Sequence, residues 1–333
     1  MHAGARSVVG GRRRCGRTLR TMSLDLSIVV PVLNERDNVE PLMVDIVREA
    51  DELGVSYEVI VVDDGSRDGT GELLDQLVGQ YRQLTVIHFD GNFGQTAAMA
   101  AGWENSTGRI IVTMDGDRQN DPADIAMLLR KLDEGYDCVS GWRQKRQDTG
   151  LRRWPSIVAN RIISHITRVE LHDYGCTLKA YRRGSLNPAH MYGEMHRFLP
   201  AFVVANGGRV AELVVRHHAR VAGSSKYGLN RTARVIADLF LIRLLTKYRT
   251  RPSHLFARVA QALTFAAAGM MAIAGIQWLF RWGPLFGFPF LAAVTLGVGA
   301  VVVLTVGLTT ELVFRGHYLD SDRRYWRIKR RVP

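Results

Sequence analysis

Two aspartates separated by one glycine follow a short apolar stretch near the middle of the chain. Asp115 and Asp117 come directly after residues 109–114, a β-branched run typical of a buried strand in a parallel sheet. In open α/β sheets the ends of such strands face the ligand crevice, and Gly116 lets the backbone turn there. These carboxylates suit a divalent cation that carries a nucleotide diphosphate, with Gln119 as a neutral oxygen ligand or a phosphate donor. Taken alone, the same residues also fit a solvated acidic turn.

Polar residues also follow two earlier apolar runs. Asn34 and Glu35 come after the strand expected at residues 26–31, and Asp63 and Asp64 come after the one at 57–62. Each motif alone is a weak signal, because an aspartate at a strand end can bind a base or ribose or can cap the next helix. Three acidic strand ends at the spacing of successive strand–helix units together predict a nucleotide pocket with a metal beside it. No glycine-rich phosphate loop is present, which argues against a dehydrogenase or an NTPase.

Strand and helix patterns alternate with short links from residue 26 onwards. Helices are expected at about 38–53, after residue 70, in the alanine-rich stretch up to residue 103 and at 122–132. Further strands are expected at 84–89, at 136–140 and, as the last of the domain, at 210–217. This order predicts an α/β domain over residues 23–228 with an open, mostly parallel, doubly wound sheet. One rim of that sheet then collects Asn34, Glu35, Asp63, Asp64, Asp115 and Asp117.

The formal net charge of +12 is unevenly distributed along the chain. Residues 21–228 hold 23 Lys and Arg against 28 Asp and Glu, and the basic surplus lies in residues 1–20, 229–258 and 315–333. The last two segments flank an apolar region, so the charge is typical of a membrane surface and argues against nucleic-acid binding. The three cysteines show no metal or redox spacing and fit a reducing, cytosolic face.

The two ends of the chain have different compositions. Residues 1–22 are rich in Arg and Gly without an apolar core, which predicts a disordered basic tail and a translation start at Met22. Residues 229–256 alternate apolar and basic side chains and predict interfacial amphipathic helices.

Residues 259–280 and 282–310 contain no charged side chain, and each is long enough to cross a hydrocarbon core of about 30 Å. They predict two transmembrane helices within 257–314, followed by a basic cytoplasmic tail at 315–333. Core helices of a soluble protein rarely lack charge for so long. Basic residues crowd the outer ends of the pair, so the positive-inside rule places both ends and the α/β domain in the cytoplasm, at the inner cell membrane. A chain cut after about residue 251 keeps every carboxylate strand end and is expected to bind the donor.

Together these motifs resemble the inverting family 2 glycosyltransferases of GT-A fold. The similar segments are residues 31–35, 61–66, 92–95 and 115–122. Residues 173–182, residues 225–227 and the apolar hairpin are similar to the polyprenyl-phosphate sugar transferases. That group includes dolichyl-phosphate mannosyltransferases and undecaprenyl-phosphate 4-deoxy-4-formamido-L-arabinose transferases. The resemblance covers about residues 24–315, and Arg118 departs from it, because the family usually has an apolar residue there.

The resemblance implies transfer of a sugar, with inversion, from a nucleotide-sugar donor, expected to be a UDP-sugar, to undecaprenyl or another polyprenyl phosphate. It implies nucleotide-sugar binding by Pro31, Asn34, Glu35, Asp63, Asp64 and Asp115. It implies Mg²⁺ or Mn²⁺ held by Asp115, Asp117 and Gln119. The catalytic residues it implies are Asp115, Asp117, Arg143, Arg152 and Ser156. The acceptor phosphate would be held by Arg143, Arg152, Ser156 and Lys226. It also implies a homotetramer.

Other functions stay open from the sequence. A GDP-mannose-dependent polyprenyl- or dolichyl-phosphate mannosyltransferase shares these motifs, since neither the sugar nor the base can be read from them. A non-catalytic membrane-bound nucleotide-sugar binding protein would be expected to lose the metal carboxylates, which are intact here. A processive polysaccharide synthase would need more transmembrane spans and a Gln-x-x-Arg-Trp acceptor motif, and neither is present.

Arg152 and Ser156 are four residues apart on an expected helix and therefore point the same way. Arg152→Ala is expected to raise the KM for the lipid phosphate while leaving nucleotide binding close to normal, because a hydrogen bond to a charged group is worth roughly 1.5–3 kcal/mol. Steady-state kinetics with each substrate varied in turn measure this. Equal damage to donor and acceptor binding would show that Arg152 has a structural role.

Overall fold

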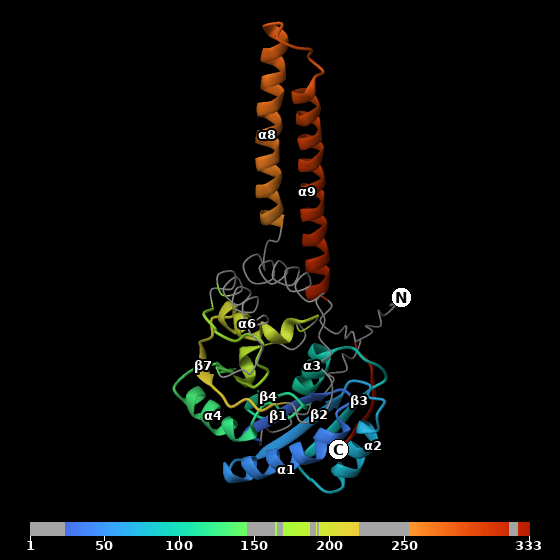
Figure 1. The fold of residues 1–333 in the computed structure, drawn as a ribbon, viewed down its shortest axis with the longest axis vertical. Helices are drawn as coiled ribbons and strands as arrows, with labels where there is room; N and C mark the ends of the chain where they lie inside the picture. Colours follow the sequence, from blue (N-terminus) through green and yellow to red (C-terminus); the bar gives the residue numbers. More distant parts are fainter. Residues whose placement is uncertain are drawn as a thin grey trace, which may run out of the picture.

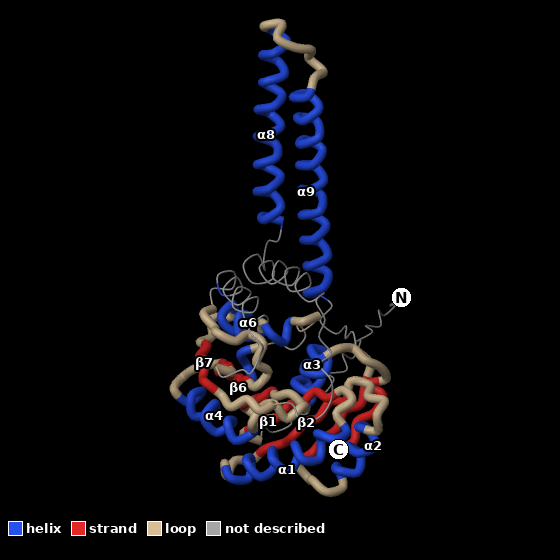
Figure 2. The backbone as a smooth tube through the Cα atoms, viewed as in Figure 1, coloured by secondary structure: helices blue, strands red, loops and turns tan. Residues whose placement is uncertain are grey.

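The described part of the chain forms an α/β domain and a long two-helix hairpin (Figure 1). The structure is a computed structural model, and it describes residues 24–144, 164, 169–186, 191, 193–219, 253–319 and 326–333. The hairpin projects from one side of the domain, and the last residues of the chain return to the domain (Figure 2). The α/β domain is therefore built from residues that come before and after the hairpin in the sequence.

The domain contains an eight-stranded mixed sheet in the order β7-β5-β6-β4-β1-β2-β3-β8. The neighbours β1–β2, β1–β4, β2–β3 and β5–β7 are parallel, and β4–β6, β5–β6 and β3–β8 are antiparallel. The strands are β1 (Leu26–Val32), β2 (Tyr57–Asp63), β3 (Leu84–Phe89), β4 (Ile110–Thr113), β5 (Cys138–Trp142), β6 (Lys179–Arg182), β7 (Val210–Val214) and β8 (Ile328–Val332). The expected open, mostly parallel sheet is confirmed.

Helices cover both faces of the sheet (Figure 1). One apolar core lies between the sheet and α1, α2 and α4, and a second lies between the sheet and α3 and α6, on the side of the hairpin. The alanine-rich α3 packs closely, because a Cβ at Gly102 would collide with Val29 of β1. The helices are α1 (Arg36–Glu52), α2 (Thr70–Val78), α3 (Gln95–Asn105), α4 (Ile125–Asp133) and α6 (Leu199–Ala205), with short 3₁₀ turns η1 (Pro122–Asp124), η2 (Arg183–Ser185) and η4 (Met195–Arg197).

Two strands were not anticipated from the sequence. The four residues of β6 lie antiparallel between β4 and β5, and their short, charged pattern carries no strand signal of its own. The strand at 210–214 is not the last of the domain, because β8 follows the hairpin and pairs with β3. Residues 315–333 were expected to be a basic tail, yet Trp326 is buried in the core on the α3 side and Ile328 packs against it. Basic side chains on an exposed edge strand are common, since they discourage further strand pairing.

The hairpin consists of α8 (Ser253–Leu279) and α9 (Phe288–Leu319), which lie side by side (Figure 1). Both are long and apolar enough to cross a membrane. Most residues of their apolar stretches are exposed in the structure, whereas core helices of a soluble domain are mostly buried. The helices approach closely at Gly307, where an added Cβ would meet the side chain of Phe256. The link between them is longer than expected, because α9 begins at Phe288. The expected basic tail at 1–22 and most of the expected interfacial segment, residues 229–252, lie outside the described residues.

A chain that ends near residue 251 would lack β8 and Trp326, so it would expose the edge of β3 and part of the core. In the full chain, Trp326→Ala is expected to destabilise the α/β domain by about 3 kcal/mol, because a buried indole is replaced by a cavity. The lowering of Tm in detergent micelles measures this. Trp282→Ala is the matched control, since Trp282 is 76% exposed in the link between α8 and α9. Equal Tm values for the two variants would contradict the structural role of the returning strand.

Candidate active site at the carboxyl ends of the strands

Asp64 connects the end of β2 to the loop that precedes α3. Its carboxylate accepts hydrogen bonds from the backbone N–H groups of Phe93, at 2.7 Å, and Gly94, at 2.9 Å. Burial raises the pKa of Asp64, while these two hydrogen bonds oppose the rise. The Asp64 side chain thus holds the loop before α3 at the end of β2.

Asp63 is buried beside it and faces His88 of β3. Its carboxylate accepts from the N–H of Ser66 at 2.9 Å and lies 3.0 Å from Nδ1 of His88. Burial acts to raise the pKa of Asp63, but the hydrogen bonds with His88 and Ser66 outweigh it and hold the pKa below its ordinary value. Asp63 is therefore held ionised by groups of the protein itself.

The loop after β1 forms one side of a cavity of about 390 Å³. Asn34 has a positive φ of 52°, its N–H donates to Ser66 Oγ at 2.8 Å, and its Oδ1 accepts from the N–H of Arg67 at 2.8 Å. Asn34 therefore locks the loops after β1 and β2 together. The described residues that line the cavity are Leu33, Asn34, Gly65, Ser66, Arg67, Phe89, Asp90, Gly91, Asn92 and Lys329.

Of the predicted nucleotide-binding residues, Asn34 is the one found in this lining, and Pro31, Glu35, Asp63, Asp64 and Asp115 are not part of it. Pro31 is buried within β1, opposite Val62 of β2. The carboxylate of Glu35 accepts from Nδ2 of Asn38 at 2.7 Å, at the start of α1. In the structure, Pro31 is thus part of the paired end of β1, and Glu35 stabilises the first turn of α1.

Asp115 and Asp117 lie at the end of β4, on the same rim. Asp115 accepts a hydrogen bond of 2.6 Å from Nε2 of Gln95, the first residue of α3. Gly116 allows the turn to lie against β1, because a Cβ there would contact Val32 at 2.6 Å. Burial, and then the negative charge of Asp117, raise the pKa of Asp115. Gln95 was part of a recognised motif, but its bond to Asp115 is visible only in the structure.

The donor set at Asp115 and Asp117 fits a hard divalent cation. Two neighbouring like charges that are withdrawn from water raise the free energy of the folded chain, and a cation held by the two carboxylates would compensate both. The described part of the chain holds no group of three or more His, Cys, Asp or Glu residues that could bind a metal by themselves. Mg²⁺ and similar ions are often bound by one or two carboxylates plus substrate phosphates and water, which suits this arrangement. The N–H of Gln119 donates to Asp117 at 3.1 Å, so Gln119 stands beside the pair.

Arg143, just after β5, is held by Asp173 through two hydrogen bonds, from Nε at 2.7 Å and Nη2 at 3.0 Å. Burial acts to lower the pKa of Arg143, but Asp173 raises it well above its ordinary value. The guanidinium charge also acts on Asp115, where it opposes the rise in pKa. A cation held in place by Asp173 therefore acts electrostatically on Asp115, and Asp173 is a positioning partner that the sequence analysis did not single out.

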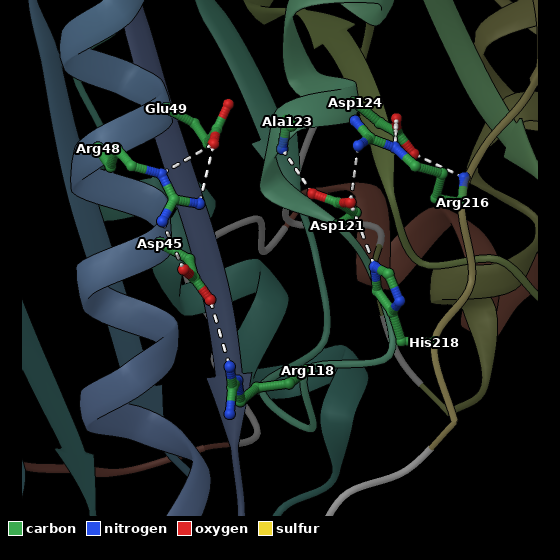
Figure 3. A network of polar contacts seen from close by, with 9 residues as sticks. All are labelled: Asp45, Arg48, Glu49, Arg118, Asp121, Ala123, Asp124, Arg216 and His218. Atoms are coloured by element: carbon green, nitrogen blue, oxygen red, sulfur yellow. Dashed lines mark hydrogen bonds and ion pairs between the residues drawn. The ribbon is translucent and has the colours of Figure 1, made fainter.

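Arg118, the residue that departs from the family pattern, points away from the carboxylates. Its φ is 59°, and its guanidinium lies 3.4 Å from Asp45 of α1 (Figure 3). The same figure shows that the segment after β7 is bound to the loop after Asp117. Arg216 and His218 contact Asp121 and Asp124, with Nε of Arg216 2.8 Å from Asp124. This segment leads toward Lys226, which lies outside the described residues together with Arg152 and Ser156.

The fold of the domain is that of the GT-A glycosyltransferases. The crystal structure of glucosyl-3-phosphoglycerate synthase from Mycobacterium tuberculosis, in complex with Mn²⁺, UDP and glucosyl-3-phosphoglycerate, superposes with a TM-score of 0.52 at 20% sequence identity. The match covers 66% of this chain and 79% of that one. At this identity the similarity shows the fold alone.

Sequence comparison gives the family. Residues 27–188 match the model of glycosyl transferase family 2. The chain is 40% identical to dodecaprenyl-phosphate galacturonate synthase of Rhizobium johnstonii, over 90% of each protein. It is 34% identical to undecaprenyl-phosphate 4-deoxy-4-formamido-L-arabinose transferase of Shewanella sediminis, over 87% of each protein. The chain belongs to the family 2 glycosyltransferases, in the group of polyprenyl-phosphate sugar transferases that use a nucleotide-sugar donor.

Asp117→Ala is expected to abolish transfer and the cation-dependent part of nucleotide diphosphate binding, because the charge of the cation then loses one of its two carboxylates. Titration with UDP in the presence and absence of Mn²⁺ measures the effect. Asp133→Ala, at the exposed end of α4, removes one carboxylate elsewhere and serves as the control. Near-normal turnover of the Asp117 variant in metal-repleted assays would contradict this assignment.

Proposed function

We propose that this enzyme transfers a sugar from a UDP-sugar to undecaprenyl phosphate, with inversion and with Mg²⁺ or Mn²⁺, at the cytoplasmic face of a membrane. The observation that carries the proposal is the pair of carboxylates after β4, the partly buried Asp115 and the buried Asp117, with the charge of Arg143, held by Asp173, acting on Asp115. This arrangement offers a place for a cation and a fixed positive charge within one crevice. The relatives named for lipid-phosphate acceptors support a polyprenyl phosphate as the second substrate.

The nature of the acceptor decides what the protein must supply. A polyprenyl phosphate is already an oxyanion near neutral pH, so it needs alignment with C1 of the sugar more than it needs a general base. One phosphate oxygen forms the bond to C1 while the bond from C1 to the diphosphate oxygen breaks, and UDP leaves with the electron pair. Attack from the face opposite the leaving group inverts the anomeric centre.

The residues of the chain divide this work. We propose that Arg143, oriented by Asp173, binds the acceptor phosphate together with Arg152, Ser156 and Lys226. Asp115 and Asp117 would hold the cation, with Gln119 beside them, and a bound cation would neutralise the charge of the departing diphosphate. The hydrogen bond from Gln95 orients Asp115 for this role. Mn²⁺ and UDP in the structure of glucosyl-3-phosphoglycerate synthase support the choice of ion and nucleotide.

The hairpin holds the domain at the surface where the acceptor is located. A lipid confined to the bilayer reaches the crevice efficiently only if the enzyme is attached to the same membrane, which raises the effective concentration by about 10²–10⁴. The basic residues at the outer ends of α8 and α9 support a cytoplasmic domain.

A donor panel tests the proposal. The purified full chain in vesicles with undecaprenyl phosphate is offered UDP-galacturonic acid, UDP-4-deoxy-4-formamido-L-arabinose, UDP-glucose and GDP-mannose, with Mg²⁺, Mn²⁺ or a chelator. Labelled sugar is expected in the lipid fraction from one of the UDP-sugars, and galacturonate is the first candidate because of the relative that is 40% identical. Transfer from GDP-mannose alone would instead show a mannosyltransferase. Donor binding without transfer from any member would favour a non-catalytic binding protein.

A further inference from the structure

Lys329 lies on β8, beyond the hairpin, and it lines the same cavity as Asn34 and Arg67. The other basic side chains of this strand and its approach are engaged elsewhere in the domain. Arg327 pairs with Asp90 at 3.5 Å, Arg330 pairs with Asp75, and Arg331 donates to Oδ1 of Asn105 at 3.3 Å. Among the described residues, the ammonium group of Lys329 has no hydrogen-bond or ion-pair partner. It is therefore available to a ligand in the cavity.

The strand pairing is irregular at this residue. His88 lies opposite Arg330 and Phe89 lies opposite Ile328, so Lys329 is the extra residue of a β-bulge and has no residue opposite it on β3. Bulges redirect a side chain and are frequent beside active sites. Here the irregularity lets Ile328 pack against the core while Lys329 lines the cavity.

A second connection joins β8 to the rim. Arg330 contacts Asp75 of α2, Asp75 lies 3.1 Å from Nε2 of His88, and Nδ1 of His88 lies 3.0 Å from Asp63. This chain of charged and polar groups runs from the returning strand to the carboxylate at the end of β2. Strand β8 thus lines the cavity through Lys329, and it connects to Asp63 at the end of β2 through Arg330.

We propose that Lys329 binds the nucleoside of the donor, by donating a hydrogen bond to a carbonyl oxygen of the base or to a ribose oxygen. The cavity is lined by the loops after β1, β2 and β3 and by Lys329, and Asp115 and Asp117 are not among the described residues that line it. The strands β4, β1, β2 and β3 are parallel neighbours, so these loops lie at the same edge of the sheet as the two carboxylates. The proposed donor has its diphosphate at the carboxylates and its nucleoside in the cavity. An ammonium group is a hydrogen-bond donor only, and uracil and ribose both present oxygen acceptors. The inference rests on the proposed function and adds to it a residue from beyond the hairpin.

Binding of UDP and of inorganic diphosphate to the full chain in detergent, with Mn²⁺ present, tests this role. Lys329→Gln is expected to raise the Kd for UDP about tenfold and to leave the Kd for inorganic diphosphate unchanged, since only UDP has a nucleoside. The KM for the donor should rise with it, while the KM for the lipid phosphate stays within about twofold. Lys329→Arg, which keeps the charge and the donors, is expected to retain most of the affinity.

Arg331→Gln is the matched control, because it removes the same charge from the same strand at a residue that contacts Asn105 instead of the cavity. Equal weakening of UDP and diphosphate binding by Lys329→Gln would overturn the nucleoside contact, and so would equal effects of Lys329→Gln and Arg331→Gln. An unchanged Kd for UDP in Lys329→Gln, with normal binding by the unaltered chain, overturns this inference alone. Absence of UDP binding by the unaltered chain overturns the proposed donor as well. A loss of Tm common to all variants of β8 would assign the strand a structural role only.

Discussion

The withdrawal of carboxylates from water at one rim of the sheet is the constraint on which the rest of the site depends: Asp63, Asp64 and Asp117 are buried, and Asp115 is partly buried. A carboxylate withdrawn from water is costly unless hydrogen bonds or opposite charges compensate it. Asp64 is compensated by two backbone N–H groups and Asp63 by His88 and Ser66, so both hold loops in place. Asp115 has Gln95 as a neutral donor, and the charge of Asp117 still raises its pKa. The rim thereby places two like charges next to each other at the end of β4, where a bound cation would compensate them.

The path of the chain connects the membrane hairpin to the construction of this rim. In chain order, β7 comes before the hairpin of α8 and α9, and β8 comes after it and completes the edge of the sheet beside β3. Residues on both sides of the hairpin therefore share one hydrophobic core, as Trp326 shows.

The partner of each arginine near the rim decides where its positive charge acts. Arg118 immediately follows Asp117 in the chain, yet its guanidinium contacts Asp45 on α1. Arg143 is 26 positions after Asp117, and its charge nevertheless opposes the rise in the pKa of Asp115, because Asp173 holds the guanidinium in place. Arg118, the cation nearest to Asp117 in the sequence, thus contacts α1. The cation that acts on Asp115 is Arg143, at the end of β5.

The sequence by itself determined the class of fold, the strand ends that carry carboxylates and the two long apolar helices. These features are local: a buried strand, an amphipathic helix and an uncharged span of more than 20 residues each have a pattern that can be read without knowing their neighbours. The confirmed family follows from the same local motifs. Only the tertiary structure decided that β6 and β8 are strands. Pairing with β4 and β5 defines β6, pairing with β3 defines β8, and the basic residues of both segments give no strand pattern in the sequence. Likewise, only the packing decided that Asp63 and Asp64 bind loops of the protein and that Lys329 lines the cavity. Hydrogen bonds across 25 to 30 positions, and a strand that returns from beyond the hairpin, leave no periodic trace in the sequence.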